Sequence, residues 1–171
     1  MKTFTKIIAS SIAAFFIFVS PVFANDIYIQ QSGNTLDLDI TQDGQNNVAG
    51  TSSAGIVLQG NTMTFNIDQV GNSNVVSATV KGVTYTGNID LTGNSNDVAL
   101  LCSSASTGNC DTVSMSIDVT GSSADINVSI GEGADAENFT GTIDVTSAAD
   151  ETITLTANGK SAIADIDVTN S

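Results

Sequence analysis

The chain has no histidine and no tryptophan, and it holds one proline, two cysteines and four lysine or arginine residues among its 171 residues. The absence of histidine excludes catalysis by an imidazole base and metal sites that need histidine ligands. The 18 acidic residues outnumber the cations and set a formal net charge of −14. Because a nucleic-acid-binding protein must neutralise phosphates with lysine and arginine, this composition also excludes nucleic acid as a partner.

The N-terminal segment has the features of a secretory signal peptide. Lys2 and Lys6 precede an apolar run at residues 7–19, and Val22-Phe23-Ala24 supplies the small residues that a signal peptidase accepts. We therefore expect residues 1–24 to be removed on export, which places the mature chain outside the cell or on its outer surface. No later apolar stretch is long enough to span a bilayer, so membrane insertion is not expected.

Residues 25–171 are expected to form a single domain built from repeats. A block that begins Gly33-Asn34-Thr35 aligns without a gap with a block that begins Gly60-Asn61-Thr62. An isoleucine recurs at the same place in every copy, at intervals of 22 to 28 residues: Ile40, Ile67, Ile89, Ile117, Ile143 and Ile166. A period of this length is typical of solenoids and other repeat architectures.

Each copy alternates apolar and polar residues on both sides of a short turn, which is the period of a β-strand. The sequence therefore predicts an all-β fold, a β-solenoid of about five to six stacked strand-turn-strand repeats with the six isoleucines as its core spine. Glycine tolerates positive φ, and we expect this property to explain the repeat-turn glycines Gly44, Gly71, Gly93 and Gly121. The alternative is an antiparallel sandwich of the same short strands, although sandwiches do not normally repeat a turn motif in register.

Ile40-x-Gln42-x-Gly44-x-x-Asn47 and Ile67-x-Gln69-x-Gly71-x-x-Asn74 resemble the curlin repeat, the unit of curli amyloid subunits. The resemblance covers residues 27–98, and residues 99–171 hold degenerate copies. Leu36 and Met63 stand where the family pattern has serine. The resemblance implies a secreted subunit that polymerises with itself into extracellular fibres for cell adhesion and biofilm matrix. It also implies a Gram-negative source and an outer-membrane secretion or nucleation partner.

Stacked amide side chains can form hydrogen-bond ladders, because glutamine and asparagine carry both donors and acceptors. We expect an assembly ladder from the inward glutamines and from the asparagines at the arches: Gln42, Gln69, Asn47, Asn74 and Asn96. An alternative for the asparagines is that they serve only the turn, through their tolerance of positive φ. The glutamines have no role in a turn, which makes them the stronger candidates.

Cys102 and Cys110 are the only cysteines, and they cannot complete a zinc site without further ligands. An exported chain meets an oxidising compartment, so we expect these two residues to form a disulfide. Free thiols or a bond between subunits are the alternatives.

An aspartate follows the isoleucine in five copies and is expected to point outward: Asp68, Asp90, Asp118, Asp144 and Asp167. These carboxylates recur with the repeat, whereas a catalytic pair is unique, so we do not expect an enzyme. We expect a solvated acidic column. Calcium bound by this acidic face, or by the loop of residues 131–138, is an alternative, and no other cofactor is expected.

Neither end of the repeat array has a proline, a group of lysines or an amphipathic cap that would blunt its edge strand. An uncapped edge favours a self-assembling fibre subunit. Two other functions stay open: a monomeric surface or adhesin module that uses the solenoid as a rigid presenter, and an ice-binding protein with regular threonine columns. Aspartates interrupt the threonine columns, which disfavours ice binding.

Overall fold

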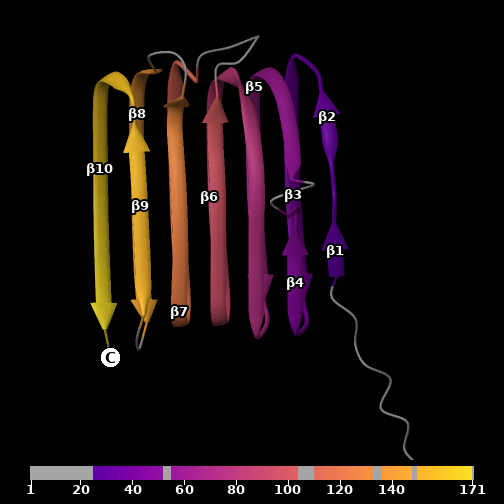
Figure 1. Cartoon of the computed structure of the whole chain (residues 1–171). Helices are drawn as coiled ribbons and strands as arrows, with labels where there is room; N and C mark the ends of the chain where they lie inside the picture. The colour runs from indigo at the N-terminus through magenta and orange to yellow at the C-terminus, as the bar shows by residue number, and fades with distance from the viewer. Residues whose placement is uncertain (1–24, 52–54, 104–109, 133–135, 148–149, 171) are drawn as a thin grey trace, which may run out of the picture.

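The computed structural model describes residues 25–170, apart from residues 52–54, 104–109, 133–135 and 148–149. The signal peptide expected at residues 1–24 lies outside the described residues. The strands follow one another in a single row of coils (Figure 1). In chain order they are β1 (Asn25–Ile27), β2 (Gln30–Ser32), β3 (Thr35–Asp43), β4 (Asn46–Ala49), β5 (Ile56–Val70), β6 (Ser73–Ser103), β7 (Thr112–Glu132), β8 (Ala136–Ser147), β9 (Glu151–Ala157) and β10 (Gly159–Asn170).

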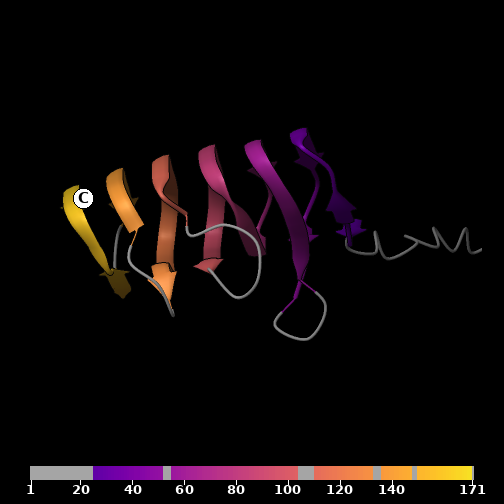
Figure 2. The ribbon, with the colours of Figure 1, turned by 90° about the horizontal axis from the view of Figure 1, so that it is seen from above.

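Every strand pairing within the described ranges is parallel, so the chain advances by one coil at a time. The long strands β5, β6 and β7 contribute to both sides of the coils, which Figure 2 shows from above. This β-solenoid of about five turns confirms the predicted fold. The antiparallel sandwich is wrong, because it requires pairings of the opposite direction.

Each coil contributes one strand segment to each of two sheets. The Ile sheet contains residues 35–43, 62–70, 84–92, 112–120, 138–147 and 161–170. The Asn sheet contains residues 25–32, 46–49 with 56–59, 73–82, 95–103, 123–132 and 151–157. Inward side chains from both sheets meet between them and form the core.

The register of the Ile sheet holds from the first coil to the last, including the coils whose sequences are degenerate. Pairing places the isoleucines of the predicted spine in one column: Ile40, Ile67, Ile89, Ile117, Ile143 and Ile166. The first five are buried, but Ile166 is 45% exposed. The prediction that Ile166 belongs to the core is therefore wrong. No described strand of the Asn sheet follows β10. The inward side chains of β10 therefore have no next coil to pack against and stay partly exposed.

Close approach of the backbone, and not a positive φ, requires glycine at three of the repeat turns, Gly71, Gly93 and Gly121. Among the described residues only Gly50 and Gly131 are glycines with a positive φ, so the explanation predicted for Gly44, Gly71, Gly93 and Gly121 is wrong. A Cβ atom on Gly93 would overlap the carbonyl oxygen of Gly71, and one on Gly121 would overlap that of Gly93. Successive turns therefore stack backbone on backbone.

Two other glycines make room for rings of their own strands. A Cβ atom on Gly87 would overlap the ring and hydroxyl of Tyr85, and one on Gly141 would overlap the ring of Phe139. Both rings are buried. Burial raises the pKa of the Tyr85 hydroxyl, which has no hydrogen-bond partner in the described part of the chain. The core thus fills the space above each glycine with the neighbouring aromatic side chain.

Candidate assembly site

The two inward glutamines form a short buried ladder. Gln42 and Gln69 are 4% and 0% exposed, and the Nε2 atom of Gln69 donates a hydrogen bond to Oε1 of Gln42 at 2.6 Å. The next position of this column is Leu91, which offers no donor. The Oε1 atom of Gln69 is consequently buried and has no hydrogen-bond partner among the described residues. An unsatisfied buried acceptor costs about 1–3 kcal/mol, so the ladder is incomplete at this end.

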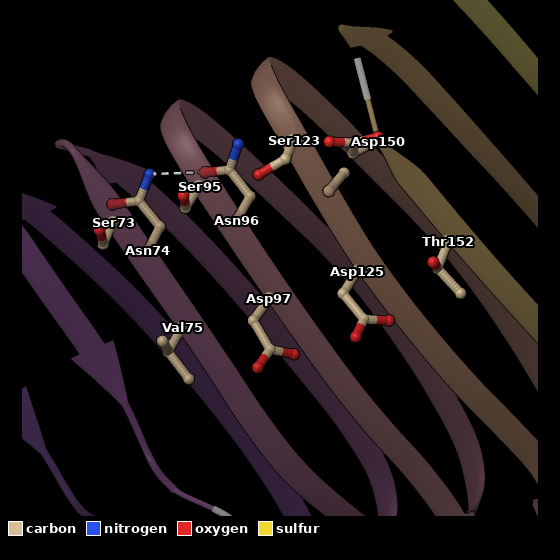
Figure 3. A pocket seen from close by; sticks show the side chains of 11 residues that line it. Ser73, Asn74, Val75, Ser95, Asn96, Asp97, Ser123, Asp125, Asp150 and Thr152 are labelled. Atoms are coloured by element: carbon tan, nitrogen blue, oxygen red, sulfur yellow. Dashed lines mark hydrogen bonds between the residues drawn. The ribbon is translucent and has the colours of Figure 1, made fainter.

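The arch asparagines form a second ladder, five residues further along each coil and in the Asn sheet. The Nδ2 atom of Asn47 donates to Oδ1 of Asn74 at 3.2 Å. Nδ2 of Asn74 donates to Oδ1 of Asn96 at 2.9 Å, as Figure 3 shows. All three side chains are buried. Nδ2 of Asn74 also donates to the carbonyl oxygen of Thr92 at 3.0 Å, and Nδ2 of Asn47 donates to that of Val70 at 2.9 Å, so these two amides link neighbouring coils through side chain and backbone. The column then reaches Ala124, where the ladder stops.

The asparagines do not owe their place to positive φ. Among the described residues other than glycine, only Cys110 and Asp150 have positive φ. The alternative, in which tolerance of positive φ explains the asparagines, is therefore wrong. Their role, and that of the glutamines, in assembly between molecules stays a prediction.

The outward aspartates lie in one column of the Ile sheet. Pairing brings together Asp68, Asp90, Asp118, Asp144 and Asp167 in sequence. The pKa of the Asp90 carboxyl is raised by partial burial and then by the charges of Asp118 and Asp68. Within the described ranges no group of three or more acidic or cysteine residues is arranged to hold a metal ion. Residues 133–135 of the expected calcium loop lie outside the described residues.

Sequence reasoning missed an acidic groove on the outer side of the Asn sheet, beside the asparagine ladder (Figure 3). Its volume is about 440 Å³, and Asp97, Asp125 and Asp150 are among the residues that line it. Burial, followed by the charge of Asp125, raises the pKa of the Asp97 carboxyl. A signal was present in the sequence, because Asp97 and Asp125 each follow the arch position of successive copies.

Cys102 and Cys110 are joined by a disulfide, and both residues are buried. The residues between them include 104–109, which lie outside the described part of the chain. The bond therefore joins the end of β6 to a residue two positions before the start of β7. It links the Asn-sheet segment of the fourth coil to the Ile-sheet segment of the same coil.

The two ends of the solenoid differ in their edge strands. At the N-terminal end the edge strands are β1 and β2 of the Asn sheet, with three residues each, and β3 of the Ile sheet, with nine. At the C-terminal end β10 has 12 residues and pairs with β8 on one side only within the described chain. Its side chains include the exposed Ile163, Ile166 and Val168, with exposed fractions of 66%, 45% and 42%. A long apolar edge strand is a template for pairing with another chain.

Comparison with known proteins gives no relative from which to infer a function. No protein-family model, no curated protein and no solved structure matches the chain. A search of the described residues for a helix long and apolar enough to cross a membrane finds none.

Proposed function

We propose that this protein is an exported, curlin-like subunit that assembles with itself into extracellular amyloid fibres, which serve cell adhesion and biofilm matrix. The observation that carries the proposal is the open edge of β10, on which inward-column residues Ile166 and Val168 are exposed. In the preceding coil the equivalent residues, Ile143 and Val145, are 1% and 0% exposed. Full burial of such a side chain stabilises by roughly 1.5–3 kcal/mol, and covering the exposed part of Ile166 and Val168 by a coil of another molecule would supply about half of that for each.

The interior chemistry supports the same proposal. Buried amide ladders and in-register apolar columns are the features that stabilise stacked β-strands in fibres. The many acidic residues give a net charge of −14, which keeps an unassembled chain soluble during export. An outer-membrane secretion or nucleation partner would deliver such a chain to the cell surface and start the fibre.

The test begins with the protein diluted from denaturant, followed by light scattering and negative-stain microscopy. The proposal expects unbranched fibres. Ile166→Lys with Val168→Lys places charges on the inward side of β10 and should abolish fibre growth. The matched control, Ile163→Lys with Thr169→Lys, adds the same charge to the outward side of the same strand and should leave growth nearly unchanged.

A monodisperse monomer that forms no fibres at any concentration would contradict the proposal. That result would favour the alternative, a monomeric β-solenoid surface or adhesin module. Circular dichroism of both lysine variants before assembly distinguishes a loss of fibre growth from a loss of folding.

A further inference from the structure

We infer that the open C-terminal end receives the N-terminal coil of a second copy in one fixed register, with Ile40 of the second copy beside Ile166. This inference rests on the proposed self-assembly and adds which strands meet and how they align. Within the described residues β3 pairs only with β5, and β10 pairs only with β8. Each therefore has one free edge, and the two edges belong to the same sheet of the solenoid.

The two end coils have the same span, so both sheets can align at once. As many residues separate Asn25 from Ile40 in the first coil as separate Glu151 from Ile166 in the last. The coil with Asn74 and Ile89 has the same span, whereas the other coils between the ends carry additional residues, such as residues 50–55 within the Asn sheet. The alignment that pairs Ile40 with Ile166 therefore also pairs Asn25 with Glu151, without a gap or an overhang.

Side-chain size favours this alignment in the Ile sheet. Ala162 and Ala164 of β10 would lie beside Leu36 and Leu38 of the second copy. Inside the solenoid the same columns also place small residues beside large ones, as Gly87 lies beside Phe65. Two exposed alanines therefore leave the space that two leucines need, and tight filling of such space is what stabilises a core.

The Asn sheet continues its columns in the same alignment. Ile153 and Leu155 of β9 are only half-buried, and they would lie beside Ile27 and Ile29 of the second copy. In the preceding coil Ile126 and Val128 occupy the positions of Ile153 and Leu155, and both are buried. Apolar side chains thus cover apolar side chains on both sheets.

The asparagine column carries an independent indication. By backbone register this column runs through Asn25, Asn47, Asn74, Asn96, Ala124 and Glu151. The Oε1 atom of Glu151 is buried and has no hydrogen-bond partner in the described chain. In the inferred alignment the next residue of the column is Asn25 of the second copy, and asparagine is a residue type that supplies hydrogen-bond donors.

A tail-to-tail dimer is less favourable on grounds of charge. Antiparallel pairing of two β10 strands about Ile166 would set Asp165 of each copy opposite Asp167 of the other. Like charges directly opposite each other destabilise a strand pair. The inferred alignment instead places Asp167 beside Thr41 of the second copy and leaves one acidic pair, Asp165 with Asp39.

Cysteine cross-linking tests the register within assembled fibres. Copies that carry Thr41→Cys are mixed with copies that carry Asp167→Cys, assembled and oxidised, and the dimer is measured on a non-reducing gel. Adjacent in-register strands lie about 4.8 Å apart, which a disulfide can bridge. The native cysteines are already bonded and do not interfere. The control mixture, Asp39→Cys with Asp167→Cys, is two residues out of register and beyond disulfide reach.

Random mixing gives each introduced cysteine its partner at about half of the junctions, so the inference expects cross-linked dimer to approach about half of the chains in the first mixture. The control should stay at the background of single-cysteine samples. A dimer from the control mixture would overturn the register. A dimer from Asp167→Cys copies alone would overturn the head-to-tail arrangement. Fibres that form without the 41–167 bond would refute this inference and leave the proposed function standing, whereas the absence of fibres would refute the proposed function itself.

Discussion

The aspartate column predicts that removing a single carboxylate, in Asp90→Asn, stabilises the protein in a pH-dependent way. Asp90 lies between Asp68 and Asp118 on neighbouring strands, and these charges together with burial raise its pKa. Carboxylates about 5 Å apart repel by about 0.8 kcal/mol per pair in water. Two neighbours therefore cost about 1.5 kcal/mol, and screening at 0.1 M salt reduces this to about 1 kcal/mol.

The sign follows from the direction of the pKa shift. A pKa that is raised in the folded state means that the folded protein binds the proton more tightly than the unfolded chain does. Stability is therefore complete below the ordinary pKa of 3.8 and is lost as the pH rises through the raised value. Asp90→Asn should increase the free energy of unfolding by about 1 kcal/mol at pH 8 and by little at pH 3.

Urea unfolding followed by circular dichroism, at both pH values and at low and high salt, measures this difference. Asp167→Asn is the matched control, because Asp167 ends the column and has one neighbour there, Asp144. Asp165 lies two residues away on the same face and adds a weaker repulsion, so the effect of Asp167→Asn at pH 8 should be smaller than that of Asp90→Asn but more than half as large. An equal gain from Asp90→Asn at pH 3 and pH 8, or a gain that high salt leaves unchanged, would show that charge repulsion is not the cause.

Three further predictions follow from the interior. Gly93→Ala should lower the free energy of unfolding by about 3 kcal/mol or more, because the new Cβ would overlap the backbone of Gly71. In the control, Gly33→Ala, the new Cβ meets only a flexible leucine methyl group, and the loss should be less than about 1 kcal/mol. Equal losses in urea unfolding would contradict backbone stacking. Gln69→Leu should cost about 1–3 kcal/mol by removing the hydrogen bond that Oε1 of Gln42 accepts from Gln69. The double variant with Gln42→Leu should recover most of this loss in a double-mutant cycle, and simple additivity would argue against the ladder. Ile67→Asp should abolish the folded circular dichroism spectrum, because it buries an unpaired charge; a retained native spectrum would mean that the assigned face is wrong.

The alternation of the sequence was sufficient to predict which side chains are buried. With Ile67 inward, a period of two also turns Met63, Phe65 and Gln69 inward, and all four are at most 1% exposed. The repeat spacing likewise predicted which residues of different copies would pair. Both features depend only on local geometry and on the alignment of copies, and a sequence displays these directly.

What sequence reasoning could not predict depends on contacts between coils. The overlap that fixes Gly93 involves the backbone of Gly71 in the preceding coil, and no local preference of either residue reveals it. The exposure of Ile166 depends on which strand follows it in space, because the residue itself is identical to its buried equivalents. The lack of a donor for Gln69 required knowing that Leu91 is its neighbour in the column.

The amide ladders lie in the first coils, which indicates that different parts of the solenoid define the strand register and supply the stability. A stack of parallel strands could slip by two residues and still keep apolar side chains inward, so apolar columns alone define the register weakly. A buried amide that slips loses its hydrogen bonds, which costs about 1–3 kcal/mol for each unsatisfied group. The amide ladders occupy the first coils: the glutamine column is apolar from Leu91 onward, and the asparagine ladder ends at Asn96. The first coils therefore define the register, and the short connections of the chain carry that register into the later coils, where apolar burial supplies most of the stability.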